Sequence, residues 1–397
     1  MPTAEEFYRI KRLPPYVFEE VNALKARLRA EGRDVIDFGM GNPDSPTPPH
    51  IIEKLVETAR KPKTNRYSAS KGIVGLRRSI ARYYERRFGV KLDPMKEVIA
   101  TLGSKEGFAN LAEAITAPGD VILAPDPAYP IHAYGFIIAG GVVRAVPAPT
   151  PEAYLSGMGR AIHRITPKPT AMVLNYPSNP TAQIVGLDFY KDAVAFSKKH
   201  DLWVLSDLAY AEIYFGDEAP PSILAVPGAK EIAVEVNSLS KTYSMAGFRI
   251  GMAVGNERLI AALGRVKSYL DYGAYTPIQV ASSAALDGPQ DCVDEIRAVY
   301  RSRRDALVES FAKAGWEIPL PSASMFAWTP IPEPYKALGS IGFAKKLMEE
   351  ADVAVAPGLG FGEHGEGFVR IGLVENEQRI RQAARNVKKM LSRRNAA

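Results

Sequence analysis

Between residues 95 and 255 the chain alternates short β-branched runs with longer amphipathic stretches, and this alternation constrains the fold more than any other feature. The expected strands cover residues 97–101, 120–124, 142–146, 170–175, 203–206, 231–236 and 250–254. Expected helices between them include 107–115, 187–200 and 257–269. Strands that alternate with helices in this way form a mostly parallel sheet with helices on both faces. We therefore predict an α/β fold.

The rest of the chain has a different pattern. A charged helix is expected over residues 292–315 and another helix over 343–351, with strands at 325–329, 353–356 and 369–373 and a basic helix at the end. The N-terminal arm carries Pro14, Pro15 and an expected helix over 17–29, but it has no apolar core of its own. We expect an arm and part of a small domain over 1–44, a large domain over 45–285, and a small α+β domain over 286–397.

Composition excludes several classes of protein. The 397 residues are 46% hydrophobic and 24% charged, which is typical of a globular chain. The single cysteine, Cys292, cannot form an internal disulfide framework or a multi-cysteine metal site. No apolar run reaches the roughly eighteen residues of a membrane helix, and residues 1–12 lack the apolar centre of a secretory signal. We expect a cytoplasmic enzyme with no metal and no membrane partner.

The net charge of +6 comes from small basic clusters at 77–78, 86–87, 301–304 and 388–394. These clusters lie in helix-like stretches, where we expect solvated faces. A nucleic-acid surface would be one continuous basic stripe with aromatic residues among the basic ones, and no such stripe is visible. We therefore expect no nucleic-acid partner. An anionic small molecule explains a few basic residues equally well.

Lys241 follows the apolar strand 231–236 and is flanked by the small hydroxyl residues Ser238 and Ser240. Open α/β sheets bind ligands at this end of their strands, although an isolated lysine there is commonly a solvated loop residue. Arg249 follows shortly afterwards. A lysine that can form an imine, with an arginine and hydroxyls to hold a phosphate, meets the needs of a pyridoxal phosphate site.

Asp207 ends the apolar strand that begins at Trp203, and Tyr210 follows it. An aspartate in this place is often the N-cap of the next helix. Beside the lysine it fits a second role, because a carboxylate paired with a pyridine nitrogen keeps the ring protonated. Tyr210 is then a candidate donor to the phenolic oxygen of the ring.

Two further loops follow strands. In the first, Pro177 and Pro180 restrict the residues before them to extended backbone, which makes a rigid loop that carries Asn179. In the second, Gly103 leads into a helix that begins near Ser104 and Lys105. Amide groups at a helix start, with the Ser104 hydroxyl, form an anion site suited to a phosphate, while the Walker pattern of a nucleoside triphosphate site is absent.

Arg370 lies within the otherwise apolar strand 369–373. A lone arginine in a strand usually faces solvent, but apolar neighbours and the following glycine favour a fork that grips a carboxylate. The glycines at 360, 362 and 365 match a dinucleotide fingerprint in form only. That fingerprint opens a helix after a strand, whereas here a strand follows, so an NAD-dependent dehydrogenase is a weak alternative.

Taken together in chain order, the segments described above resemble the fold-type I, class I/II pyridoxal phosphate aminotransferases over essentially the whole chain. The residues that carry the resemblance are Gly41-Asn42-Pro43, Tyr67, Gly103-Ser104-Lys105, Tyr129, Asn179-Pro180, Asp207, Tyr210, Ser238, Ser240, Lys241, Arg249 and Arg370. Within the family, stretches 12–18, 40–44 and 207–211 are similar to those of bacterial glutamate–pyruvate (alanine) aminotransferases. The LL-diaminopimelate aminotransferases share several of these stretches.

The resemblance implies a fold-type I transferase with a mostly parallel seven-stranded sheet, a smaller α+β domain and pyridoxal 5'-phosphate as cofactor. Lys241 would hold the cofactor as a Schiff base and move the substrate proton, and Asp207 would pair with the pyridine nitrogen. Asn179 and Tyr210 would contact the phenolic oxygen, and Tyr129 would stack on the ring. The phosphate would be held by Ser104, Lys105, Ser238, Ser240 and Arg249.

The resemblance also implies a homodimer, because Tyr67 would reach the phosphate in the neighbouring subunit's site. Arg370 would bind the substrate α-carboxylate with help from Gly41 and Asn179, and Lys105 is the candidate for a second carboxylate. The expected reaction is ping-pong transfer of an amino group from alanine to 2-oxoglutarate, with aspartate or LL-diaminopimelate as alternative donors. A carbon–sulfur lyase or decarboxylase and a ligand-binding transcription regulator are weaker alternatives.

Overall fold

A seven-stranded sheet forms the centre of the molecule. The computed structural model describes residues 7–14 and 17–394, so residues 1–6 and 15–16 of the expected arm and 395–397 of the expected small domain lie outside the described residues. The strands are β2 (Val98–Thr101), β3 (Val121–Asp126), β4 (Val142–Pro147), β5 (Ala171–Asn175), β6 (Trp203–Asp207), β7 (Ala233–Ser238) and β8 (Gly251–Gly255). Each overlaps one of the seven expected strands.

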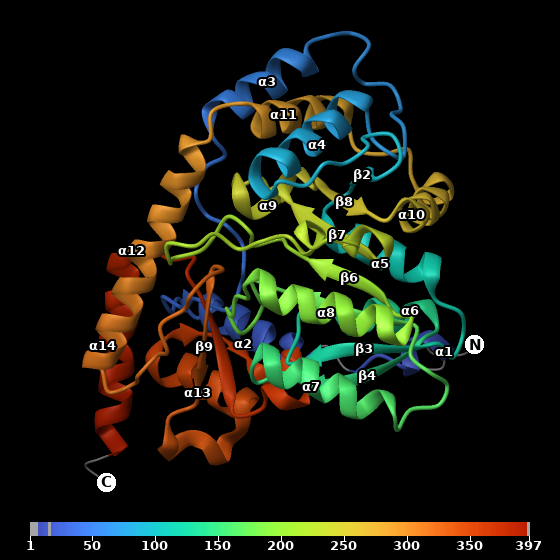
Figure 1. Ribbon diagram of the computed structural model, residues 1–397. Helices are drawn as coiled ribbons and strands as arrows, with labels where there is room; N and C mark the ends of the chain where they lie inside the picture. The colour runs from blue at the N-terminus through green and yellow to red at the C-terminus, as the bar shows by residue number, and fades with distance from the viewer. Residues whose placement is uncertain (1–6, 15–16, 395–397) are drawn as a thin grey trace.

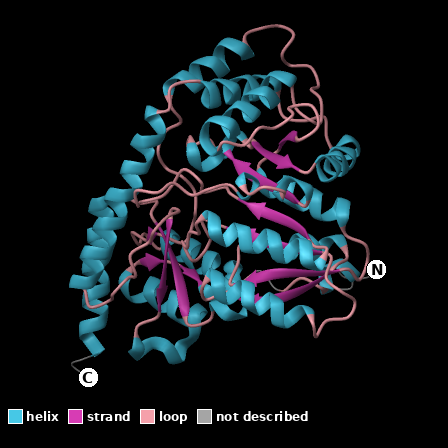
Figure 2. Ribbon diagram, in the orientation of Figure 1, coloured by secondary structure: helices cyan, strands magenta, loops and turns pink. Residues whose placement is uncertain are grey.

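The strand order is β2-β8-β7-β6-β5-β3-β4. Strand β8 runs antiparallel to both of its neighbours, and the remaining pairs in this sheet are parallel. The predicted mostly parallel sheet is therefore confirmed (Figure 2). Every residue of β2, β5, β7 and β8 is buried, because helices cover both faces and leave no polar alternation in the sequence.

Successive residues of the strands pack into two separate cores. One core holds α5 (Ser104–Ile115), α6 (Ile131–Ala139) and α10 (Glu257–Leu270). The other holds α4 (Val74–Phe88), α7 (Pro151–Ile162), α8 (Leu187–His200) and α11 (Thr276–Asp287), and α3 (Pro49–Ala59) packs on α11. Figure 1 shows α7 and α8 in front of the sheet.

A third core joins the two ends of the chain. It holds α2 (Phe18–Ala30), α12 (Asp291–Lys313), α13 (Gly339–Ala351) and α14 (Glu377–Arg394). A three-stranded antiparallel sheet has the order β11 (Ala356–Pro357), β12 (Phe368–Gly372), β9 (Phe326–Pro330), and β1 (Ile36–Asp37) pairs with β10 (Val353–Ala354). The long helix α12 lies beside α14 and joins this part to the large sheet (Figure 1).

Two expectations need correction. The single strand expected over 353–356 is two strands, because the chain changes sheet at Val355. The expected solvated faces are also wrong at two basic clusters: the Arg77 side chain is buried and donates to the Pro94 carbonyl at 2.9 Å, and buried Arg303 forms a two-pronged ion pair with Asp44 at 2.6 and 2.7 Å. The domain boundaries after residues 44 and 285 stay predictions.

The short helix α1 (Tyr8–Lys11) belongs to the arm, and Arg12 after it donates to the carbonyl of Ile137 at 3.4 Å, at the end of α6. The arm thus contacts helix α6 through Arg12 and the third core through α2. Within residues 7–14 and 17–394, no helix combines the length and the apolar character that crossing a membrane requires.

Candidate active site

A cavity of about 520 Å³ opens where the parallel strands end, between the large sheet and the three-stranded sheet. All but one of the residues predicted for the site line it: Gly41, Ser104, Lys105, Tyr129, Asn179, Asp207, Tyr210, Ser238, Ser240, Lys241, Arg249 and Arg370. Its volume is within the usual range for small-molecule sites. The exception is Tyr67.

Lys241 lies in the four-residue helix α9 (Leu239–Thr242), which begins where β7 ends. Its Nζ donates to the carbonyl oxygen of Gly41 at 2.8 Å. Burial, together with the positive charges of Arg370 and Arg249, lowers the pKa of Lys241 from 10.5 to about 8. About half of the amine is therefore neutral at pH 8, in the form that attacks a carbonyl carbon.

Asp207 ends β6 and contacts His132 of α6. Nε2 of His132 lies 2.9 Å from Oδ2 of Asp207, and the imidazole is completely buried. The other oxygen, Oδ1, accepts from the amide of Ala209 at 3.0 Å within a turn, and no helix begins there. The alternative of a helix N-cap is therefore excluded, and the carboxylate is left in the cavity beside a second titratable group.

A compact anion site lies at the start of α5. Gly103 has a φ of 88°, and a Cβ atom there would lie 2.4 Å from Nη2 of Arg249, so the close approach of the guanidinium needs glycine. Arg249 itself has a φ of 52° and donates to the Leu102 carbonyl at 3.4 Å. The helix amides, the guanidinium and the hydroxyls of the segment 238–240 surround one place that suits a phosphate.

Tyr129 and Tyr210 also line the cavity. Burial raises the pKa of both phenols, so both stay protonated and can donate a hydrogen bond at neutral pH. Nζ of Lys105 lies 5.7 Å from the centre of the Tyr129 ring, which places the Lys105 side chain at the edge of the cavity rather than away from it. The ring of Tyr210 packs edge-on against Phe326.

Arg370 points into the cavity from β12, where it pairs in register with Trp328. The residue is only 7% exposed, so it is not the solvent-facing arginine of the alternative interpretation. Its Nη1 donates to Oδ1 of Asn179 at 2.9 Å, and its Nη2 donates to the Gly39 carbonyl at 3.2 Å. The guanidinium carbon lies 4.0 Å from the centre of the Phe326 ring. These contacts fix a planar fork for a carboxylate.

Tyr67 lies outside this cavity. Its side chain is 87% exposed and contacts the ring of Tyr272, with ring centres 4.8 Å apart and the planes tilted by 39°. Tyr269, Leu270 and Tyr275 are also exposed. Tyr67 does not line the cavity that contains Lys241 of its own chain, so its role in a neighbouring subunit's site stays a prediction.

Sequence reasoning missed three residues that support the site. Asn175 donates to the Asp207 carbonyl at 3.0 Å and accepts from the Asn179 amide at 2.9 Å, which joins two of the strand-end loops. Its position at the end of β5 was a usable signal. His132 and Glu212 gave no comparable signal, because neither lies at the end of a strand.

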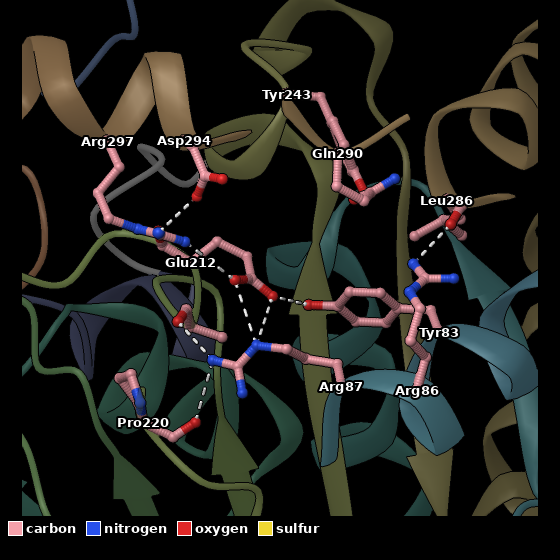
Figure 3. A network of polar contacts seen from close by, with 11 residues as sticks. Tyr83, Arg86, Arg87, Glu212, Pro220, Tyr243, Leu286, Gln290, Asp294 and Arg297 are labelled. Carbon is pink, nitrogen blue, oxygen red and sulfur yellow. Dashed lines mark hydrogen bonds and ion pairs between the residues drawn. The ribbon is translucent and has the colours of Figure 1, made fainter. Parts of the chain in front are cut away.

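Glu212 holds the segment that follows Tyr210 (Figure 3). Its buried carboxylate accepts from the Tyr83 hydroxyl at 2.6 Å and from Nε of Arg87 at 3.0 Å. Arg297 of α12 donates to the Glu212 carbonyl oxygen at 2.9 Å and lies 3.6 Å from its carboxylate. The loop after Asp207 is thus tied to both α4 and α12.

The glycines at 360, 362 and 365 do not form a dinucleotide site. They lie in and between two short 3-10 turns, Gly358–Phe361 and Glu363–Gly365, and the chain continues directly into β12. No helix starts there, so the expectation that this fingerprint is accidental is confirmed. Phe361 instead lies against Arg370, with the guanidinium carbon 4.6 Å from the ring centre.

The cavity residues fit pyridoxal phosphate. A buried amine with a lowered pKa suits its aldehyde, the α5 start with Arg249 suits its phosphate, and the carboxylate of Asp207 suits its pyridine nitrogen. These three groups come from segments at the ends of strands of the large sheet, and Arg370 comes from β12 of the three-stranded sheet.

Comparisons with known proteins agree with this reading. The family Aminotransferase class I and II matches residues 33–387. The chain is 64% identical to "Putative aminotransferase AatC" of Rhizobium meliloti over 98% of its own length and 96% of that protein. It is 53% identical to "Glutamate-pyruvate aminotransferase AlaC" of Escherichia coli over 97% and 93%, and 40% identical to the LL-diaminopimelate aminotransferase of Moorella thermoacetica over 98% and 99%.

A solved aspartate aminotransferase of Thermus thermophilus superposes with a TM-score of 0.89 and 29% identity, covering 98% of this chain and all of that one. The fold is that of the fold-type I pyridoxal phosphate aminotransferases. The chain belongs to the class I and II aminotransferases, a family of pyridoxal phosphate-dependent enzymes.

Proposed function

We propose that this aminotransferase moves an amino group between alanine and 2-oxoglutarate, with pyruvate and glutamate as products. The observation that carries the proposal is the joint placement of the Lys241 amine, the Asp207–His132 pair and the Arg370 fork in one cavity. When bound, pyridoxal phosphate supplies a carbonyl for the amino group and a ring that accepts electrons from the substrate Cα.

Substrate binding depends on the carboxylate site. Two N–H groups of Arg370 can meet two carboxylate oxygens, and the Asn179 and Phe326 contacts hold the guanidinium plane in place. A Cβ atom at Gly41 would lie 2.7 Å from the Phe326 ring, so glycine keeps this wall of the cavity open. We assign Arg370, Asn179 and the Gly41 backbone to the α-carboxylate.

Lys241 moves the proton. Because its pKa is about 8, Nζ can take a proton from the substrate Cα and return it without a large energetic mismatch near neutral pH. The Asp207 carboxylate, in contact with His132, favours a proton on the pyridine nitrogen. Tyr210, Asn179 and Tyr129 line the cavity. Tyr210 and Asn179 would donate to the phenolic oxygen of the bound cofactor, and Tyr129 would pack on its ring.

The substrate pair follows from the cations near the cavity. The stretch 268–277 contains neither arginine nor lysine, which argues against a second arginine fork from this segment. Lys105 remains as the candidate for the distal carboxylate of glutamate, and its side chain lies by Tyr129. A single flexible ammonium also tolerates the methyl group of alanine, unlike a rigid fork. The AlaC relative, at 53% identity, supports this pair.

LL-diaminopimelate is the second candidate donor, because LL-diaminopimelate aminotransferases are about 40% identical over nearly the whole chain. Aspartate is a third. Decarboxylation is disfavoured, since the Arg370 fork stabilises the carboxylate that would have to leave. A carbon–sulfur lyase and a transcription regulator have no further support in the structure.

We also propose a homodimer in the cytoplasm. Three large aromatic side chains are exposed to solvent: Tyr67, Tyr269 and Tyr272. Exposed aromatic residues of this kind fit a surface that a second copy of the chain covers. Tyr67 would then contact the phosphate in the partner's site. The single cysteine fits a reducing compartment.

The test is a panel of amino donors with the purified holoenzyme. We expect alanine with 2-oxoglutarate, and glutamate with pyruvate, to give the highest kcat/KM. A clear preference for LL-diaminopimelate or aspartate would replace the proposed substrate pair, and absence of transamination with every donor would reject the activity.

A further inference from the structure

Asp37 lies between the arm helix α2 and the residues around the substrate-carboxylate arginine. Its Oδ2 lies 2.7 Å from Nζ of Lys25 and 3.6 Å from Nη2 of Arg29, both on α2. Its Oδ1 accepts a hydrogen bond from the amide of Gly39 at 3.0 Å. Lys25, Asp37 and Gly39 all line the cavity.

The chain of contacts continues from Gly39 to Arg370. The Gly39 carbonyl accepts from Nη2 of Arg370 at 3.2 Å, while Nη1 of the same guanidinium donates to Asn179. Gly39 therefore presents its amide to Asp37 and its carbonyl to Arg370. A change in how Asp37 holds this peptide segment would therefore move the Gly39 carbonyl, which accepts from the guanidinium.

The ion pair is shielded from solvent. The side chains of Lys25 and Asp37 are each only 13% exposed, so water and salt screen their attraction less than at an open surface. A Cβ atom at Gly39 would lie 3.3 Å from Oδ1 of Asp37, which shows how closely the carboxylate packs on this backbone. Polar contacts that are shielded from water in this way hold the groups that make them in one conformation in preference to others.

A second contact joins α2 to the same arginine. The ring of Phe18 on α2 packs edge-on against Phe361, with ring centres 5.6 Å apart. Phe361 in turn lies against the guanidinium of Arg370. Helix α2 thus approaches the arginine both through Asp37 and Gly39 and through an aromatic pair.

We propose that Asp37 is a positioning residue that couples the docking of helix α2 to the orientation of Arg370, through Lys25 on one side and Gly39 on the other. The proposal rests on the assignment of Arg370 to the substrate α-carboxylate. Because every amino acid and oxo acid substrate carries that carboxylate, the coupling acts on all substrates alike and not on one side chain.

Three variants of the holoenzyme separate the two links. Asp37→Ala removes both, Lys25→Met removes the shorter of the two ion pairs to α2 and leaves Arg29 in place, and Asp37→Asn keeps an acceptor for the Gly39 amide while it removes the charge. We expect Asp37→Ala to raise KM for alanine and 2-oxoglutarate about 10-fold each with kcat within about 2-fold, as expected for lost binding that is equal in ground and transition states.

Lys25→Met and Asp37→Asn should each raise KM about 3-fold, and their combination should be less than multiplicative because they break the same contact. Lys61→Met, which removes an exposed ion pair with Glu57 on α3, is the matched control and should leave KM unchanged. Calorimetric titration of each holoenzyme with 2-oxoglutarate measures carboxylate binding without turnover and should show the same weakening.

Unchanged KM and unchanged 2-oxoglutarate affinity in Asp37→Ala would overturn the proposal. So would a rise in KM that is matched by equal losses of cofactor content and thermal stability, because Asp37 would then act on the fold as a whole. Arg370→Lys distinguishes a failure of the Arg370 assignment from a failure of the positioning role of Asp37. If it leaves 2-oxoglutarate affinity intact, the assignment of Arg370 fails; if it weakens binding while Asp37→Ala does not, the positioning role alone fails.

Discussion

Nε2 of His132 contacts Oδ2 of Asp207 at 2.9 Å, although the two residues come from a helix and a strand that are 75 positions apart in the chain. The imidazole is fully buried, so this contact is closed to solvent. Together with the hydrogen bond from the Ala209 amide to Oδ1, it holds the carboxylate in one orientation.

The first prediction concerns this carboxylate. Asp207→Asn removes the negative charge that favours a protonated pyridine nitrogen, so proton removal from the substrate becomes harder. We expect kcat to fall by roughly 10²-fold or more, with KM changed much less. Steady-state kinetics with alanine and 2-oxoglutarate measure both.

Asp126→Asn is the matched control, because Asp126 also contacts a histidine, His364, at 2.9 Å but lies outside the main cavity. It should not reproduce the loss of kcat. If Asp207→Asn changes KM alone, Asp207 has a structural role and the assignment is wrong.

The second prediction concerns Lys241. Its lowered pKa means that the neutral amine is half-populated at about pH 8, instead of about 10.5 in the unfolded chain. Labelling of the cofactor-free protein with a trace amine reagent, read by mass spectrometry, should therefore reach its half-maximal rate for Lys241 near pH 8. Exposed Lys63 in the same sample reports the reagent's own pH dependence.

A midpoint above pH 10 for Lys241 would contradict its lowered pKa. The companion variant, Lys241→Ala, should keep the fold, as judged by circular dichroism, but lose transamination by roughly 10⁴-fold because the nucleophile and the proton carrier are removed together. Near-normal turnover would place the catalytic lysine elsewhere.

The third prediction tests whether Tyr67 acts in the partner's site. A Tyr67→Phe chain mixed with a Lys241→Ala chain should form hybrid dimers with one site that has both residues. We expect activity to rise above that of either parent, toward half of the wild-type value per dimer. Differently tagged chains and two-step purification isolate the hybrid, and a pure hybrid no more active than its parents would exclude action across the interface.

The fourth prediction concerns the distal carboxylate. Lys105→Ala should raise KM for glutamate and 2-oxoglutarate about 10-fold, a loss of about 1.4 kcal/mol of binding, and KM for alanine less than 2-fold. Lys105→Arg keeps the charge and is the control for side-chain removal. Equal changes in KM for all substrates would show that Lys105 contributes through its backbone amide alone.

The fifth prediction concerns Glu235, a buried carboxyl in β7 that the mechanism does not use. Burial raises its pKa from 4.5 to about 7, although Ser222 and Ser206 donate to it at 2.6 and 3.1 Å. Between pH 4.5 and 7, therefore, Glu235 is protonated in the folded state and ionised in the unfolded chain. Over this range the stability from Glu235 falls as pH rises, by about 3 kcal/mol.

Glu235→Gln cannot ionise at this position. The melting temperature of the variant minus that of the wild type should therefore increase as the pH rises from 5 to 8. Differential scanning calorimetry of both proteins in parallel gives the difference. A difference that does not depend on pH would show that Glu235 titrates at its ordinary pKa.

The sequence predicted which side chains line the cavity and that the sheet is mostly parallel, but not the order of its strands. Lys241, Asp207 and Asn179 each follow a buried strand, and parallel strands bring such ends together whatever their order. The order β2-β8-β7-β6-β5-β3-β4, and the reversed direction of β8, depend on contacts between segments far apart in the chain. Local hydrophobic patterns do not record those contacts.

The residues that were not predicted are likewise those whose roles depend on contacts between distant segments. His132 lies on one face of an apolar helix, where a histidine is indistinguishable from an ordinary core residue. Asp37 lies in a two-residue strand, and its partners Lys25 and Gly39 are visible only once α2 has docked. Arg370 was predictable because a charged residue within an apolar strand requires a partner.

The pairing of β1 with β10 also has a consequence for synthesis on the ribosome. A chain that has emerged through β8 already contains Lys241, Arg249 and every strand of the large sheet, so it can assemble the anion site during translation. Residues 36–37 must wait for residues 353–354, and Arg370 emerges later still. The nascent chain thus contains the residues proposed to hold the cofactor phosphate well before it contains the arginine proposed to bind the substrate.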